Sequence, residues 1–266
     1  MSWVGLPPGN ILQHLYLRER IKYLNRNSSV KRFLEIGSGN GYVSRVLLQL
    51  GLSGIGVDLN DTACENNNKL NRDYILKNQY QVINDDFISV NFEGKFDIII
   101  SCMVIEHLEY LDLEKFILKA KHLLSEKGVL ILQVPANMRY WNIEDEIAGH
   151  IKRYETADID EMCKNFNFEL LHIAGLNYPL SNWLFHISNY IIKKRESNAL
   201  QWSQRERTIY TGNRNVKYKT TFPKVFNLIL NPVFLYPFHI LQKVTRNKLK
   251  EALVIYVELK NKLKYD

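Results

Sequence analysis

The sequence predicts an α/β fold, in which a mostly parallel β-sheet carries helices on both faces. Short apolar segments alternate along the chain with helical patterns of about 10 to 15 residues. One of these segments runs directly into a glycine-rich loop at 37–41. The 266 residues are 46% hydrophobic and 24% charged, which is ordinary globular usage. This composition argues against a disordered, collagenous or coiled-coil chain.

The first half of the chain alternates regularly between the two kinds of element. A helix near 10–25 precedes a strand at 32–36, and the next helix begins at Tyr42 and ends at Gly51. The elements expected after it are a strand at 54–59, a polar helix at 61–77, and strands at 80–84 and 96–102.

The second half continues this alternation and then interrupts it. Asp112 is a good N-cap for the clearest helix of the chain, and Gly128 is expected to end that helix. The elements expected after it are a strand at 129–134, a helix after Thr156, and strands at 169–176 and 252–259. The expected organisation is one domain, residues 1–177 plus 251–266, with an inserted segment at 178–250.

The charge of the chain is distributed unevenly. Residues 1–192 carry 19 Lys and Arg against 23 Asp and Glu, whereas residues 193–266 carry 16 against five, a net charge of +11. Within the insertion, aromatic and apolar segments lie on either side of a basic stretch at 193–221, and 225–241 contains no charged residue. This pattern favours a lid over the substrate, with either a solvated basic face or a face toward an anionic membrane surface.

The cysteines and the N-terminal segment indicate a compartment. Cys64, Cys102 and Cys163 are scattered without a C-x-x-C pair, so we expect buried thiols rather than disulfides or a cysteine-built zinc site. The first ten residues lack the basic and apolar parts of a secretion signal. No apolar run reaches the ~18 residues of a spanning helix. The expected location is cytoplasmic, with peripheral attachment to a membrane left open.

The glycine-rich segment at 33–41 is the candidate cofactor-binding loop. Residues 33–41 read Phe-Leu-Glu-Ile-Gly-Ser-Gly-Asn-Gly and join a predicted strand to a predicted helix. Glycines allow a sharp turn and close approach of a ligand, and a helix N-terminus offers free N–H groups. Asp58 lies 21 residues beyond Gly37, at the end of the second strand, where a carboxylate can accept both hydroxyls of a ribose. The glycine-rich loop and Asp58 together predict a cofactor that contains adenosine.

Two other cofactor classes fit this loop poorly. The dinucleotide fingerprint G-x-G-x-x-G would need glycine at position 42, where this chain has Tyr42, so a dehydrogenase is disfavoured. A P-loop is excluded because no Gly-Lys-Ser/Thr follows the glycines.

Four motifs in order resemble those of the class I S-adenosylmethionine (SAM)-dependent methyltransferases. They are E-x-G-x-G-x-G at 35–41, Asp58, Asn84-Asp85-Asp86-Phe87, and the strand at 96–102 that runs into Val104-Ile105-Glu106-His107-Leu108. The resemblance covers about residues 30–177 and the final strand. It implies a Rossmann-like, seven-stranded sheet with the insertion before its last strand. It also implies SAM as the cofactor and S-adenosylhomocysteine as the product.

The resemblance assigns the glycine loop to the amino-acid part of SAM. Glu35 and the backbone amides around Gly37, Ser38, Gly39 and Gly41 would hold that part. The carboxylate of Asp58 would bind the ribose hydroxyls, and Leu59 would pack on adenine.

The resemblance assigns the other strand ends to adenine and to the methionine end. Asp86 would accept from the adenine amino group and the Phe87 amide would meet the ring, with Asp85 as the competing choice for Asp86. Cys102 and Met103 would line the methionine end. Loop solvation is the alternative reading of the two aspartates.

The subgroup that this chain resembles methylates small molecules. It includes the ubiquinone-pathway O-methyltransferases and enzymes of sugar, lipid and polysaccharide clusters, which share the Glu106-His107-Leu108 end and a segment like 149–154. The expected reaction is in-line methyl transfer to a small molecule, sugar or lipid-linked glycan, with O-methylation favoured.

A hydroxyl acceptor needs a base, and histidine suits this task near neutral pH. His107 is the first choice and His150 the second, while Glu106 either orients a histidine or binds substrate. Some relatives bind a divalent metal through E-x-x-E-H, but the first of those positions is Met103 here. We therefore expect no metal, although Glu106, His107 and His150 could form a weaker site.

Two alternative functions stay open. The basic C-terminal quarter would suit an RNA methyltransferase. Methylation of a base amino group usually needs an N/D-P-P-Y/F segment after the fourth strand, and this chain has Ser101-Cys102-Met103-Val104 there. An RNA ribose or carbon target remains. The other alternative is a non-catalytic SAM-binding protein.

Overall fold

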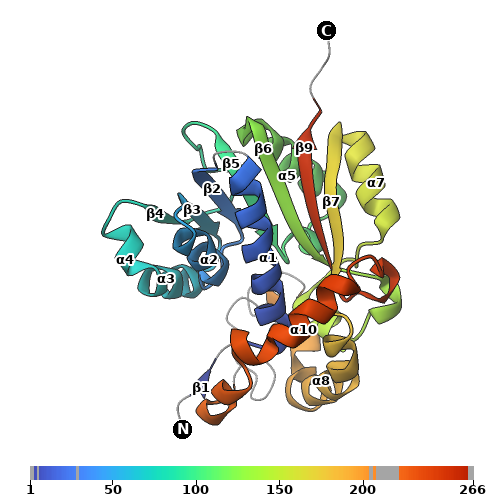
Figure 1. The fold of residues 1–266 in the computed structure, drawn as a ribbon. Helices are drawn as coiled ribbons and strands as arrows, with labels where there is room; N and C mark the ends of the chain where they lie inside the picture. The colour runs from blue at the N-terminus through green and yellow to red at the C-terminus, as the bar shows by residue number, and fades with distance from the viewer. Residues whose placement is uncertain (1–2, 5, 28–29, 204–205, 208–221, 263–266) are drawn as a thin grey trace.

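The fold is a seven-stranded sheet between two layers of helices, as expected (Figure 1). The structure is a computed structural model, and it describes residues 3–4, 6–27, 30–203, 206–207 and 222–262. Much of the basic stretch at 193–221 therefore lies outside the described residues. Among the described helices, none is both long and apolar enough to cross a membrane.

The strands and helices alternate through most of the chain. The strands are β1 (Trp3–Val4), β2 (Arg32–Ile36), β3 (Ser53–Asp58), β4 (Tyr80–Asn84), β5 (Phe96–Cys102), β6 (Leu124–Pro135), β7 (Phe168–Leu176), β8 (Phe222–Pro223) and β9 (Val254–Asn261). The α-helices are α1 (Pro8–Asn27), α2 (Tyr42–Gln49), α3 (Asp61–Leu70), α4 (Arg72–Ile75), α5 (Tyr110–Leu123), α6 (Ile143–Ala148), α7 (Thr156–Asn165), α8 (Leu180–Glu196) and α10 (Pro232–Val244). The 3-10 turns are η1 (Ile105–His107), η2 (Met138–Tyr140), η3 (Ser197–Gln201), η4 (Lys224–Leu228) and η5 (Leu249–Glu251).

The order of the strands places the site. The sheet runs β4-β3-β2-β5-β6-β9-β7, with β9 antiparallel to both of its neighbours and the first five strands parallel. The chain moves outward from β2 to β4 and then returns to the other side of β2 with β5. Ligands of such sheets bind beyond the carboxyl ends of the strands at this switch point. The loops that follow β2, β3, β4, β5 and β6 are therefore the ones expected to border a ligand.

The two faces of the sheet have separate cores. Apolar side chains of α5 and α7, such as Phe116 and Ile159, pack with one face of the strands. Side chains of α1 and α2, such as Ile21 and Leu47, pack with the other face. An ion pair joins the layers, since Arg20 of α1 donates two hydrogen bonds, of 2.8 and 2.7 Å, to the buried carboxylate of Glu258 in β9.

Three sequence predictions of element boundaries are wrong. The residue at the N-cap of α5 is Glu109 rather than Asp112, which lies inside the helix and bonds Lys115. Gly128 does not end that helix, because β6 already begins at Leu124. Glycine is needed at this position of β6 since a Cβ there would lie 2.8 Å from the Phe96 carbonyl oxygen. The polar helix expected at 61–77 is divided into α3 and α4, which meet at Asn71. The side-chain amide of Asn71 donates a hydrogen bond to the carbonyl of Gly41.

The described part of the segment between β7 and β9 contains two long helices. The first of them, α8, packs on α6 through Ile192, Ile147 and Ile143. The second, α10, packs along α1, where Leu235 meets Ile11 and Leu12. Figure 1 shows α8 and α10 below the sheet. Helix α6, which α8 contacts, belongs to the connection that follows β6. The described part of this segment thus adjoins the loops that follow the strands.

Candidate active site

The loop after β2 turns sharply under the control of three glycines. Gly37, Gly39 and Gly41 have φ angles of +74°, +48° and +81°, a region that disfavours other residues. A Cβ on Gly37 would lie 2.3 Å from Val104, and one on Gly41 would lie 2.2 Å from Asn67. A Cβ on Gly39 would meet no atom within 4 Å. Two glycines are thus required by packing, and the third faces open space.

Asp58 is held against this loop at the end of β3. Its Oδ2 accepts a hydrogen bond of 2.7 Å from the amide of Gly39, and its Oδ1 accepts one of 2.9 Å from the amide of Asn60. The two bonds fix the orientation of the carboxylate beside the open side of the loop. Leu59 follows with 68% of its side chain exposed.

Glu35 lies beneath the loop in a buried polar network. Ser44 donates a hydrogen bond to the Glu35 carboxylate and makes another, of 2.7 Å, with the Tyr80 hydroxyl. The amide of Asn67 then donates to both Tyr80 and Ser38, at 3.0 and 3.1 Å. Burial raises the pKa of Glu35 to about 8, so the carboxyl holds its proton at neutral pH. The network supports the glycine loop from below.

The residues after β4 form a compact turn. Asp85 Oδ1 accepts from the amide of Asp86 and from the hydroxyl of Ser89, and Asp86 Oδ1 accepts from the amide of Ile88 at 2.9 Å. Both aspartates are exposed. Phe87 is buried, with its ring 5.2 Å from that of Phe116, and so anchors the turn to the core. One oxygen of each aspartate therefore serves the turn itself.

The end of β5 brings its residues to the switch point. Met103 adopts a left-handed conformation with φ +56°, and its amide donates to the Gln133 carbonyl at 2.9 Å. Cys102 is half-buried and carries a free thiol. Non-glycine residues in this region of φ are uncommon and gather at functional sites.

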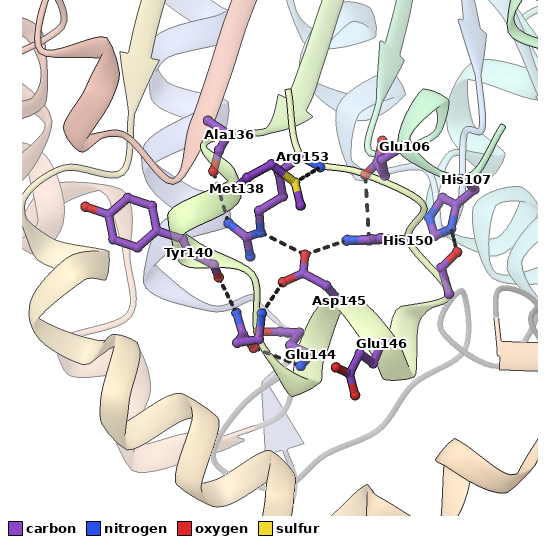
Figure 2. Close-up of polar contacts among 12 residues, drawn as sticks. Glu106, His107, Ala136, Met138, Tyr140, Glu144, Asp145, Glu146, His150 and Arg153 are labelled. Atoms are coloured by element: carbon purple, nitrogen blue, oxygen red, sulfur yellow. Dashed lines mark hydrogen bonds and ion pairs between the residues drawn. The ribbon is translucent and has the colours of Figure 1, made fainter. Parts of the chain in front are cut away.

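Glu106, His107 and His150 lie together, although the two histidines are 43 positions apart in the sequence (Figure 2). The rings of His107 and His150 meet edge to face with their centroids 4.8 Å apart, and His150 Nε2 lies 3.9 Å from Glu106 Oε1. Both carboxylate oxygens of Glu106 are buried without a hydrogen-bond partner among the described residues. Burial raises the pKa of Glu106 to about 7, because the charged form loses its hydration.

Asp145, which the sequence analysis missed, orients His150. Its Oδ1 lies 2.8 Å from His150 Nδ1 and also accepts a 2.9 Å hydrogen bond from Arg153, while Oδ2 accepts from the amide of Asn142 (Figure 2). A carboxylate only accepts, so the proton of a neutral His150 ring sits on Nδ1 and Nε2 carries the lone pair. The capping-box spacing Asn142-x-x-Asp145 at the start of α6 was the available signal.

His107 has different surroundings from His150. Its Nδ1 lies 3.3 Å from the carbonyl of Gly149, the residue before His150. Burial lowers the pKa of His107 to about 4, with the nearby His150 acting in the same direction. The ring is therefore neutral throughout the physiological range of pH.

Among the residues that the structure describes, one group could hold a metal ion. Glu106, His107 and His150 each offer a ligand atom, and these atoms lie within 4.8 Å of one another. Two imidazoles and one carboxylate suit a first-row transition metal. The same atoms could instead serve proton transfer.

Comparison with known proteins places the chain in a family. The profile of a family described as a methyltransferase domain matches residues 10–173. The ubiquinone biosynthesis O-methyltransferase of Pelagibacter ubique is 28% identical over 199 residues, which are 68% of this chain and 81% of that protein. The ubiquinone biosynthesis O-methyltransferase of Nitrosococcus oceani is 24% identical over 178 residues, 61% of this chain and 75% of that one.

Solved structures share the fold at low sequence identity. A SAM-dependent methyltransferase from Clostridium acetobutylicum superposes with a TM-score of 0.51 at 16% identity, over 62% of this chain and 83% of that chain. Magnesium protoporphyrin IX methyltransferase from Synechocystis PCC 6803, with bound S-adenosylhomocysteine, gives 0.53 at 17% identity, over 64% and 79%. The family match covers more than half of the chain and includes the glycine loop, Asp58 and the Glu106-His107 pair. The chain therefore belongs to this methyltransferase-domain family, and the prediction of a class I SAM-dependent methyltransferase is confirmed.

Proposed function

We propose that the chain binds SAM at the carboxyl ends of β2 and β3 and transfers its methyl group to a hydroxyl of a small molecule. The main support for this cofactor site is the position of the Asp58 carboxylate. It accepts a 2.7 Å hydrogen bond from the Gly39 amide and lies beside the open side of the glycine loop. A fixed carboxylate can accept from a ribose diol, and a loop without side chains admits the amino-acid part. The residues present fit the cofactor.

The other cofactor residues divide into two groups in this proposal. Leu59, Cys102, Met103 and one of Asp85 and Asp86 border the cofactor directly, with the Phe87 amide held in place by its buried ring. Glu35 acts through the network of Ser44, Tyr80 and Asn67, which fixes the loop that carries Gly37, Ser38, Gly39 and Gly41. Glu35 is therefore a positioning residue in this proposal rather than a direct ligand.

We assign the general base to His150. Bound SAM supplies a methyl group that a sulfonium makes electrophilic. His150 Nε2 accepts the proton of the acceptor hydroxyl while Asp145 holds the ring through Nδ1. The imidazolium that results lies between two carboxyl groups, those of Asp145 and Glu106. Asp145 and Arg153 are positioning residues.

His107, the first choice of the sequence analysis, is a poor general base in this environment. A pKa of about 4 leaves little driving force to take a proton from a hydroxyl near neutral pH. Its ring contacts that of His150 and its Nδ1 is anchored to the Gly149 carbonyl. We therefore propose that His107 positions the acceptor and His150.

A proton and a divalent ion would each satisfy the buried carboxyl of Glu106, and we propose the proton. With its pKa raised to about 7, Glu106 is half protonated at neutral pH and largely protonated below it. Met103 occupies the position of the missing metal ligand. Dialysis against a chelator should leave turnover unchanged. Loss of turnover that added Mn²⁺ or Zn²⁺ restores would assign the cluster to a metal instead.

The acceptor that we propose is a small molecule, a sugar or a lipid-linked glycan. It would enter between the loop after β6 and the inserted segment 178–250, which acts as a lid through the contact of α8 with α6. The three cysteines are free thiols, which suits a cytoplasmic location.

Equilibrium binding of SAM tests the cofactor site. Asp58→Ala should lower SAM affinity by at least about 100-fold, because two charge-assisted hydrogen bonds to the ribose disappear. Asp61→Ala, an exposed aspartate three residues away at the start of α3, is the matched control and should bind normally. Unchanged affinity of Asp58→Ala would place the cofactor elsewhere.

A further inference from the structure

The outer face of η4 and α10 is apolar and exposed. Val233, Val244 and Leu228 have 85%, 76% and 75% of their side chains in solvent. The other large exposed apolar residues of this stretch, which together with these three form the face that we call the α10 face, are Val225, Ile229, Phe234, Tyr236, Ile240 and Leu241.

The α10 face is not needed for packing of the helix. The opposite side of α10 already supplies its contacts to the body, through buried Leu235, His239 and Gln242. Residues 225–241 contain no Lys, Arg, Asp or Glu. An exposed apolar patch of this kind marks an interaction site.

Basic residues lie at both ends of the α10 face. Exposed Lys224 begins η4, and exposed Arg246 and Lys248 follow the end of α10. The last 74 residues as a whole carry a net charge of +11. A helix with large apolar residues on its outer face and cations at its margins suits the interface of a bilayer with anionic lipids.

We propose that the α10 face docks on the surface of an anionic lipid bilayer, with α10 lying in the plane of the interface. A span is excluded for this helix, because its 13 residues cover only about 20 Å against the ~30 Å of a bilayer core. A second copy of the chain is disfavoured as the partner, because a symmetric contact would bring two strongly positive segments together. The proposal rests on this surface alone and does not depend on the assignment of the methyl-transfer site.

Vesicle flotation at physiological salt tests the proposal on the full chain. The wild type should float with vesicles of phosphatidylcholine and phosphatidylglycerol and stay unbound with phosphatidylcholine alone. The triple variant Val233→Ser, Ile240→Ser, Val244→Ser should lower the partition coefficient by at least about tenfold, since three aliphatic side chains no longer enter the interface. These positions are exposed, so the variant should fold, and circular dichroism verifies this.

The control variant carries Leu111→Ser and Leu118→Ser on α5, where the two side chains are 66% and 51% exposed. It should bind vesicles as the wild type does, because α5 packs on the other face of the sheet from α1 and α10. Equal flotation of the triple variant and the wild type would overturn the proposal, and so would absence of binding to anionic vesicles. A wild-type dimer that the triple variant loses, without any vesicle binding, would assign the face to a second copy.

Discussion

At the scale of single residues, the buried carboxyl of Glu35 makes stability depend on pH. Its pKa is about 8 in the folded chain and near 4.5 in the unfolded chain. Between these values the folded state binds more protons, so the free energy of unfolding falls as pH rises, by up to about 1.4 kcal/mol per pH unit. Below pH 4.5 this contribution is constant.

Replacement of Glu35 by glutamine removes that titration. We expect the midpoint of thermal unfolding of the wild type to fall from pH 5.5 to pH 8 by several degrees more than that of Glu35→Gln. Thermal melts of both proteins across this range give the comparison. Parallel curves would mean that Glu35 is ionised in the folded chain.

The two histidines give a second residue-scale prediction. His150→Ala should lower kcat by about 10² to 10⁴-fold with SAM affinity unchanged, because a general base contributes that much. Asp145→Asn should also lower kcat, since the asparagine side chain no longer fixes the tautomer of His150. His107→Ala should raise the KM of the acceptor more than it lowers kcat. The reverse pattern of the two alanine variants would return the base to His107.

The positions of site residues were predictable from the sequence only where one strand end decides them. Asp58 lies at the end of β3, as the sequence predicted, and its carboxylate accepts from the glycine loop. The capping-box spacing of Asn142 and Asp145 indicates the start of a helix, but it does not specify that Asp145 contacts His150 after that helix ends. The burial of Glu35 beneath the loop depends on Ser44, Tyr80 and Asn67, which come from three different elements.

At the scale of elements, the glycine loop separates packing from ligand binding. Gly41→Ala should cost at least about 2 kcal/mol of stability, because φ is +81° and a methyl group would strike Asn67. Gly39→Ala should cost about 1–2 kcal/mol, since its φ is also positive but its surroundings are open. Denaturant unfolding of the two variants measures the difference.

Gly39→Ala should nevertheless weaken SAM binding by at least about tenfold, because its methyl group would occupy the open side of the loop. Titration calorimetry with SAM on the folded variant measures this affinity. Normal affinity would mean that the cofactor does not approach the loop at Gly39.

Element boundaries were predictable where a local signal ends a helix. Gly51 has φ +87° and follows the cap of α2, as its position suggested. Gly128 carries the same sequence signal but lies in β6, where the close approach of the Phe96 carbonyl requires it. A tertiary contact of this kind is invisible in the local sequence.

At the scale of the whole molecule, the described part of the segment between β7 and β9 contacts α6, the helix that precedes His150. Ile192 of α8 is fully buried against Ile147 of α6, the helix that begins with the cap containing Asp145. Ile192→Ala should raise the KM of the acceptor or lower kcat, with SAM affinity unchanged, because loosening of this contact moves α6. Ile117→Ala on α5, equally buried in the main core, is the control. It should lose comparable stability, about 2–4 kcal/mol, without that kinetic change.

The overall sheet was predictable because its signal is repeated many times along the chain. Apolar strands, helices of regular period and a glycine turn all agree on one topology. The arrangement of α8 and α10 was not predictable, because these helices pack on α6 and α1 through contacts between residues far apart in sequence, such as Gln242 with the Leu12 carbonyl.

The most direct test of the account uses SAM with a labelled methyl group, the purified chain and an extract of the source cells. The extract is then separated into lipid, small-molecule, protein and nucleic-acid fractions. We predict label in the lipid or small-molecule fraction, lost in His150→Ala although that variant still binds SAM. Label in nucleic acid would contradict the proposed acceptor and support the RNA alternative. Full labelling by His150→Ala would contradict the proposed base.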